Sequence, residues 1–264
     1  MNIFHINGNH IYMEDIKKIN IWKVLTYFII YSIIGFFLET IYAIFTKGML
    51  ESRKSFLYGP FCSIYGIAAI MIIYCLKPYK KSPIKIFFLG MIIGLAIEYS
   101  FSFFGELIYH ARWWDYSNNI GNINGRICVF YGIIWGILSV VLIYWITPYT
   151  EKKLDFLKYR IGIIAKITKF IVIITIIFLV FNSIITSIAL KNFINNMCIT
   201  YDIEIKDFIP NKFTENKFTK YFSDEKMIMN YPNISVITKD NKVLYLGSVL
   251  YEYKNYYYAF ENIP

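Results

Sequence analysis

The chain consists of long apolar runs that alternate with short polar and charged segments. A helix needs roughly 20 residues to cross the hydrocarbon core of a bilayer. Five runs approach or exceed that length, and we predict that they form membrane-spanning helices at residues 21–45, 58–76, 84–109, 127–146 and 170–190. The pattern therefore predicts an all-α polytopic membrane protein with about five transmembrane helices.

Residues 191–264 follow a different pattern, which predicts a small C-terminal α+β segment outside the membrane. Residues 201–208 alternate between apolar and charged side chains, the period of a half-buried strand. We expect residues 212–230 to be mostly helical. A strand meander is then predicted at residues 235–238, 242–253 and 256–260. The alternative is that the Tyr-rich end lies along the membrane interface as an aromatic belt.

The composition is typical of a membrane protein, and it affects how the positive net charge is interpreted. Hydrophobic residues make up 57% of the chain and charged residues 17%, with a net charge of +9. Most Lys and Arg residues lie between the apolar runs, where they act as topology signals rather than as a nucleic-acid-binding face. We therefore expect the lipid bilayer, and no nucleic acid, as a partner. Residues 1–20 are polar and lack the apolar region of a cleavable signal peptide, so the first span should direct insertion.

The distribution of basic residues predicts the orientation in the cell membrane. Counting the loops alternately places thirteen Lys and Arg residues on one side and five on the other, before the tail. Cytoplasmic loops carry the excess of Lys and Arg. The rule predicts a cytoplasmic segment at 1–20 and a membrane domain of two hairpins at 21–150. A basic cytoplasmic loop and the fifth span follow at 151–190, and an extracytoplasmic segment at 191–264.

An internal repeat relates the first two predicted hairpins. Gly-x-x-x-Glu occurs in the first and third runs, at Gly35 and Glu39 and again at Gly94 and Glu98. After each loop comes Gly-x-x-Cys-x-x-Tyr-Gly, at 59–66 and 125–132. The hairpins would enter the membrane in the same sense, as parallel repeats with the two glutamates facing their common axis. Each Gly lies one turn before its Glu, where it permits close helix approach.

Polar residues at one end of this repeat mark the candidate site. An ionisable side chain in hydrocarbon costs on the order of 2.5–3.5 kcal/mol, so such a residue indicates function. The candidate substrate- or ion-binding residues are Glu39, Tyr58, Tyr65, Glu98, Glu106, His110, Arg112, Trp113, Trp114, Asp115, Asn124 and Arg126. No Ser or Cys is tied by spacing to a base, so we assign no catalytic residue. The four cysteines show no CxxC spacing, and we expect no metal site, disulfide framework or cofactor.

Three short motifs in these loops are similar to a known family. They are Tyr-Gly-Pro at 58–60, His-Ala-Arg-Trp-Trp-Asp-Tyr-Ser at 110–117 and Asn-Gly-Arg-Ile-Cys at 124–128. They resemble the Putative ABC-transporter type IV family of bacterial membrane proteins, which has vertebrate relatives of unknown function. The resemblance covers roughly residues 25–150, and residues 224–233 resemble the ending of bacterial members. It implies a permease-like component, with an ATPase subunit or a homo-oligomer as its partner.

Three hypotheses for the function follow. In a permease-like component, Glu39 and Glu98 bind a cation or proton between the repeats, below an outward-facing aromatic vestibule. In a structural or sensory membrane protein, Arg112 and Arg126 neutralise these two glutamates and hold the loop in place. In an intramembrane enzyme, the less favoured hypothesis, a glutamate with His110 and Asp115 acts as acid and base on a lipid or isoprenoid.

Overall fold

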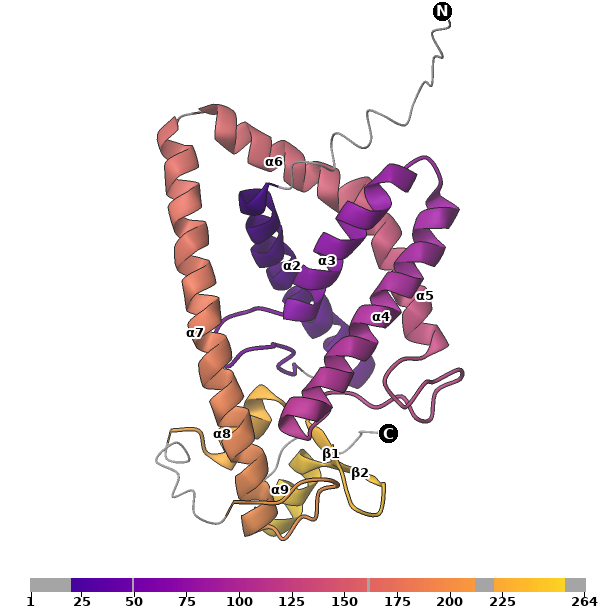
Figure 1. Ribbon diagram of the computed structural model, residues 1–264, viewed down its shortest axis with the longest axis vertical. Coiled ribbons are helices and arrows are strands. Elements are labelled where there is room, and N and C mark those ends of the chain that lie inside the picture. Colours follow the sequence, from indigo (N-terminus) through magenta and orange to yellow (C-terminus); the bar gives the residue numbers. More distant parts are fainter. Residues whose placement is uncertain (1–19, 49, 161, 212–220, 255–264) are drawn as a thin grey trace, which may run out of the picture.

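The computed structural model describes residues 20–48, 50–160, 162–211 and 221–254 (Figure 1). Its membrane part consists of six helices and two short turns: α2 (Ile21–Lys47), α3 (Ser63–Leu76), η1 (Lys77–Tyr79), α4 (Pro83–Tyr109), α5 (Val129–Val141), the π-helical turn η2 (Leu142–Ile146), α6 (Thr147–Arg160) and α7 (Gly162–Thr200). Among the described residues, four helical stretches are long and apolar enough to cross a membrane: Ile21–Lys47, Pro83–Tyr109, Val129–Asp155 and Ala165–Thr200. A shorter apolar helix, Ser63–Tyr79, lies at the second predicted span. The predicted all-α polytopic membrane fold is confirmed.

The first four helices form the two predicted hairpins. Helix α2 packs on α3 and α4 packs on α5, and both hairpins run in the same sense (Figure 1). Their ends follow local rules, since Asn20 caps α2 and Ser82 caps α4 ahead of Pro83. A shared core of large buried side chains, including Tyr27, Ile72 and Ile86, joins the hairpins.

The segment before α3 is irregular rather than helical, so the prediction of a span beginning at residue 58 is wrong at its start. Gly59 has φ +80° and is followed by Pro60, and both oppose a helix here. The Cys62 amide donates to the Ser32 carbonyl near the middle of α2. Helix α3 therefore begins deep in the bundle, and irregular backbone reaches the same depth.

Side chains of α7 satisfy this irregular backbone. The Asn182 amide group accepts from the Tyr58 amide at 3.3 Å and donates to the Tyr58 carbonyl at 2.7 Å. The Thr186 hydroxyl accepts from the Leu57 amide at 3.0 Å. Asn182 and Thr186 are almost fully buried and lie in the middle of α7. Non-helical backbone at membrane depth is tolerated where protein groups pair with it in this way.

The basic segment predicted as a cytoplasmic loop between the fourth and fifth spans is largely helical. Helix α5 continues through η2 into α6, which crosses one end of the bundle to meet α7 (Figure 1). The π-helical turn comes directly before Pro148, whose missing N–H and ring disfavour a regular α-helix. The Tyr144 hydroxyl donates to the Lys80 carbonyl and ties this bend to the α3–α4 connection.

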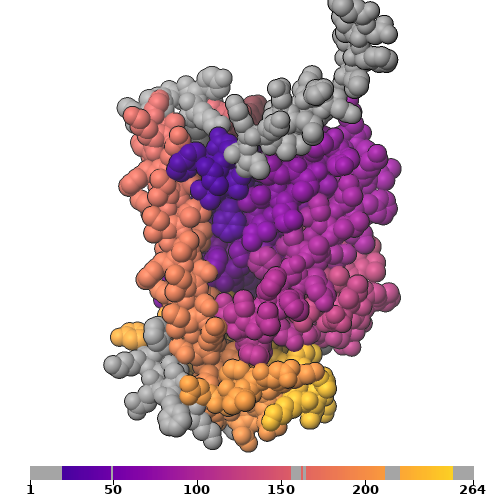
Figure 2. All heavy atoms as spheres, viewed as in Figure 1, coloured from indigo at the N-terminus to yellow at the C-terminus, as the bar shows by residue number. Residues whose placement is uncertain are grey.

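The end of α7 and the tail form a second core at the opposite end. Buried residues of α7, among them Phe193, Ile194 and Met197, pack against tail residues such as Met227 and Leu250. Figure 2 shows the tail covering this end of the helices, below α4 and α7. The tail contains α8 (Asp224–Asn230), β1 (Ser235–Ile237), β2 (Val243–Tyr245) and α9 (Leu246–Lys254). We call it the tail module.

The tail module confirms the predicted α+β character but corrects two of its elements. Strand β1 pairs with β2 in an antiparallel sheet, with Val236 opposite Leu244. Residues 246–253 are helical, not a strand, because Leu246, Val249 and Leu250 recur at helical spacing and are buried together. The predicted strand at 201–208 makes one isolated bridge, between Ile205 and Thr238. The predictions for residues 1–19, 212–220 and 256–260 lie outside the described residues.

Candidate functional site

In the first hairpin, a glycine, a tyrosine and a glutamate form one unit. Gly35 and Glu39 lie one turn apart on α2, and Tyr65 lies near the start of α3. A Cβ atom at Gly35 would overlap the Cβ and Cγ atoms of Tyr65, so only glycine admits the ring at this distance. The Tyr65 hydroxyl donates a 2.7 Å hydrogen bond to Glu39 Oε1.

The second hairpin repeats this unit with a tryptophan. A Cβ atom at Gly94 would overlap Cβ and Cγ of Trp135, whose indole N–H donates to Glu98 Oε2 at 3.3 Å. The Tyr116 hydroxyl donates to the other oxygen, Glu98 Oε1, at 2.9 Å. Burial, followed by the negative charge of Glu98, raises the pKa of Tyr116 well above its ordinary value, so the phenol remains a donor. Glu98 is only 6% exposed.

Aromatic rings join the two units. The Tyr65 and Trp135 rings are in contact, with centroids 5.4 Å apart. On the other side of Glu98, the Tyr116 ring stacks on Tyr131 at 4.4 Å, and the Tyr131 and Tyr42 hydroxyls share a 3.0 Å hydrogen bond. Glu39 and Glu98 therefore belong to one continuous cluster of aromatic residues drawn from both hairpins.

Tyr and Trp side chains, rather than cations, contact the two glutamates in the described part of the chain. Within the part of the chain that the structure describes, Glu39 and Glu98 form no ion pair; their hydrogen bonds come from Tyr and Trp side chains. Both lie well inside helices long enough to span a membrane, about two turns or more from the nearer end. Among the described residues, no basic side chain therefore compensates the negative charge of an ionised pair.

The two arginines pair with Glu106 instead, which corrects the hypothesis that they neutralise Glu39 and Glu98. Arg126 Nη2 lies 2.8 Å from Glu106 Oε2, and Arg112 Nε donates to the same oxygen. The opposing charges of Arg112 and Arg126 compensate the carboxylate, while Asp115 lies 3.8 Å from Arg112 Nη1. Arg126 also donates to Ser102 at 3.2 Å.

These contacts fold the loop after α4 back onto the helix end. The Trp114 indole donates to the Arg126 carbonyl at 2.9 Å, and the Tyr116 amide donates to the Gly125 carbonyl at 2.8 Å. The Asn124 side chain donates to the Tyr99 hydroxyl at 3.0 Å. The arginine cluster therefore positions Tyr116, the residue that reaches Glu98.

The tail module is attached to this loop through backbone atoms. Arg112 and Ser235 exchange two hydrogen bonds, N–H to carbonyl in each direction, both 2.8 Å long. His110 ends α4 in the left-handed region, with φ 54°, and its ring lies 5.0 Å from the ring of Phe208 in the tail. Trp113 packs edge-on against Tyr109. The loop is thus held between the membrane helices and the tail.

Of the predicted residues, the structure joins Glu39, Tyr65 and Glu98 in one cluster, and Glu106, Arg112, Asp115 and Arg126 in a second. Trp113, Trp114 and Asn124 support the loop, and Tyr58 contributes backbone groups to the contact with α7. His110 contacts the tail, whereas Asp115 contacts Arg112 and Ser117, so the expected acid–base set does not assemble among the described residues.

Sequence reasoning missed Trp135, Tyr116 and Tyr131 as site residues. The repeat aligned Tyr131 with Tyr65, but the residue that packs on the glycine and bonds the glutamate is Trp135, one turn later. The available signal was an indole N–H inside an apolar run, because a buried N–H needs an acceptor.

The cavity beside the aromatic cluster around Glu39 and Glu98 is small. A cavity of about 50 Å³ is lined by Gly35, Tyr65, Trp135 and neighbouring apolar side chains. That volume holds one or two water-sized particles. In the described residues no group of three or more His, Cys, Asp and Glu side chains is placed to hold a metal ion.

Fold and site together define a polytopic membrane protein of two helical hairpins, with a buried carboxylate, Glu98, and a partly buried one, Glu39, that form no ion pair among the described residues. The chain belongs to the Putative ABC-transporter type IV family, whose model matches residues 26–196. This match extends the resemblance seen in the loop motifs to include α6 and nearly all of α7. No curated protein and no solved structure gives a significant match.

Proposed function

We propose that this protein is a permease-like transport component in which Glu39 and Glu98 together bind a proton or a small cation. The carrying observation is that both carboxylates lie inside membrane-length helices and receive hydrogen bonds only from Tyr and Trp side chains in the described structure. An ionised carboxylate without a counter-charge is costly in such a setting. A bound proton or cation removes that cost, and its exchange is the elementary step of ion-coupled transport.

One further feature supports a transport role. The irregular segment before α3 reaches the middle of the bundle, where its backbone pairs with Asn182 and Thr186. Broken or late-starting helices next to a repeat interface are typical of binding sites in transporters.

In this proposal the second cluster has a positioning role. Glu106 binds Arg112 and Arg126 and so anchors the loop that carries Tyr116 to Glu98. The basic residues between the spans favour placing this loop and the tail module on the outer side of the cell membrane. An ATPase subunit or further copies of the chain would complete the transport path.

The test is ion flux through purified protein in liposomes with an imposed pH or cation gradient. We expect Glu39→Gln and Glu98→Gln each to abolish flux, because each removes one ionisable oxygen group from the pair. Glu204→Gln is the matched control, since Glu204 lies in the tail and forms an exposed ion pair with Lys239. Insertion of all variants is verified by size-exclusion chromatography in detergent. Normal flux in both site variants would overturn the proposal.

A further inference from the structure

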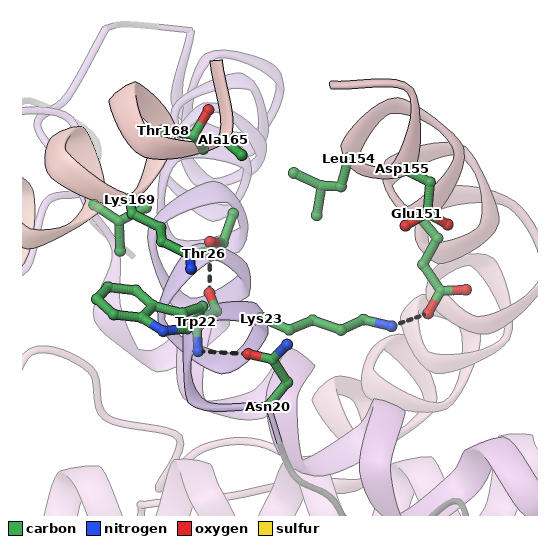
Figure 3. Close-up of a pocket in the computed structure, with 11 residues that line it drawn as sticks. Asn20, Trp22, Lys23, Thr26, Glu151, Leu154, Asp155, Ala165, Thr168 and Lys169 are labelled. Carbon is green, nitrogen blue, oxygen red and sulfur yellow. Dashed lines mark hydrogen bonds and ion pairs between the residues drawn. The ribbon is translucent and has the colours of Figure 1, made fainter. Parts of the chain in front are cut away.

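A second site lies at the opposite end of the bundle from the carboxylate pair. A cavity of about 280 Å³ opens where the start of α2 meets α6 and the first turns of α7 (Figure 3). Its lining includes Trp22 and Lys23 of α2, Glu151 and Asp155 of α6, and Lys169 of α7. We call it the α6 cavity.

Charges of both signs line the α6 cavity. Lys23 extends across it, with Nζ 2.6 Å from Glu151 Oε1. On the facing wall, Lys169 Nζ lies 5.5 Å from the centre of the Trp22 ring (Figure 3). Asp155 lies one turn after Glu151 on α6. Among the described residues that line the cavity, two lysines and two carboxylates surround the same space, so their formal charges balance.

The remaining walls combine apolar side chains with the uncharged polar residues Asn20, Thr26 and Thr168, which suits an amphipathic ligand. Leu154, Ala165 and Val172 line the cavity beside the charged groups. The volume is near the lower end of the roughly 300–1,000 Å³ typical of small-molecule sites. It accommodates a polar headgroup and the first carbons attached to it, while two acyl chains would have to lie outside.

Aromatic side chains place the α6 cavity at the level of lipid headgroups. Trp145 and Tyr149 are more than 60% exposed at this end of the helices, and Tyr79 ends the α3–η1 segment there. Trp and Tyr gather at membrane–water interfaces because one part of each ring is apolar and another forms hydrogen bonds. Lipid headgroups are therefore present at high local concentration beside the cavity.

We propose that the α6 cavity binds the headgroup of a phosphatidylethanolamine-type lipid. The phosphate would lie near Lys169 and Lys23, and the primary ammonium near Asp155 and Glu151. The neutral lining favours this zwitterionic headgroup over a purely anionic one such as phosphatidylglycerol. A choline headgroup fits less well, because its methylated nitrogen donates no hydrogen bond to a carboxylate and Lys169 already covers the Trp22 ring.

The test is native mass spectrometry of the protein released from nanodiscs that contain equal amounts of phosphatidylethanolamine, phosphatidylglycerol and phosphatidylcholine. We expect preferential retention of phosphatidylethanolamine. Lys169→Gln should weaken retention about tenfold, the effect of losing one charge-assisted hydrogen bond. Lys166→Gln is the matched control, because Lys166 is an exposed lysine of the same helix outside the lining, and it should retain the lipid.

Two further measurements test the proposal even if Lys169→Gln does not fold: the variant Asp155→Asn, and competition with a soluble headgroup. Asp155→Asn should shift the preference from phosphatidylethanolamine toward phosphatidylglycerol, because it makes the lining more positive. Equal retention of the three lipids by the unmodified protein, or equal losses in Lys169→Gln and Lys166→Gln, would overturn the proposal. Displacement of the lipid by an equal concentration of soluble phosphoethanolamine would also overturn it, because the acyl chains would then contribute nothing.

Discussion

The Tyr65 ring of the first hairpin packs against the Trp135 ring of the second, with centroids 5.4 Å apart. Each ring also rests on a glycine of its own hairpin and donates a hydrogen bond to the glutamate one turn beyond that glycine. The contact therefore connects two equivalent units at the repeat interface. A change at Glu39 has a short physical route to Glu98 through these two side chains.

The close packing on glycine predicts a strong effect of small substitutions. Gly35→Ala and Gly94→Ala should each lower the free energy of unfolding by about 1–3 kcal/mol, because the added methyl group overlaps the ring attachment of Tyr65 or Trp135. Thermal unfolding in detergent measures this. Gly162→Ala is the control, since a Cβ there meets nothing within 4 Å. Unchanged stability of both site variants would contradict the packing.

The shared carboxylate of Glu106 should matter for stability. Glu106→Gln removes the partner of Arg112 and Arg126, whose side chains are about nine-tenths buried, and should destabilise the protein by about 3 kcal/mol. Arg126→Ala should likewise reduce abundance in the membrane. Lys239→Ala breaks an exposed pair and should cost less than about 1 kcal/mol. Equal unfolding temperatures for Glu106→Gln and Lys239→Ala would show that the cluster does not anchor the loop.

The backbone bridge between Arg112 and Ser235 can be tested at a single position. Ser235→Pro removes the N–H that donates to the Arg112 carbonyl, whereas Ser235→Ala keeps it. Hydrogen–deuterium exchange of residues 110–117 should accelerate in Ser235→Pro and remain near the unmodified rate in Ser235→Ala. Protection that persists in the proline variant would mean that the tail module does not hold this loop.

The buried environment of Tyr116 predicts that the free energy of unfolding decreases at high pH. Its pKa is raised by burial and by the charge of Glu98, so the folded phenol keeps its proton above about pH 10, where an unfolded tyrosine loses it. Stability should therefore fall as pH rises above about 10, by at most about 1.4 kcal/mol per pH unit from this group. Tyr116→Phe should reduce that slope in denaturant titrations, while the exposed Tyr221→Phe should not. Identical slopes in all three proteins would contradict this environment for Tyr116.

Sequence patterns were sufficient to predict the two helical hairpins. The lengths of the apolar runs predict the helices, and the Gly-x-x-x-Glu repeat predicts which faces of α2 and α4 turn inward. The strand predicted over residues 242–253 was wrong after Tyr245 because its alternating residues also fit a helix. The positions of Leu246, Val249 and Leu250 were the signal that favours the helix.

The pairing of the arginines could not be predicted from sequence. Glu98 and Glu106 lie two turns apart on one face of α4, so either carboxylate could have paired with a basic residue in the following loop. Which carboxylate pairs with the arginines depends on how far the loop extends along that face of α4. Arg126 reaches Ser102 and Glu106, and Tyr116 instead occupies the position next to Glu98.

Infrared difference spectroscopy in liposomes tests the coupled carboxylate pair most directly. The carboxyl band is followed during pH titration, with and without added alkali cation, in the unmodified protein, Glu39→Gln, Glu98→Gln and the tail control Glu204→Gln. We predict that Glu39→Gln alters the carboxyl band of Glu98 and that Glu98→Gln alters the band of Glu39. Glu204→Gln should leave both bands intact. If Glu39→Gln leaves the Glu98 band unchanged and Glu98→Gln leaves the Glu39 band unchanged, the two carboxylates act independently, which would contradict the proposal.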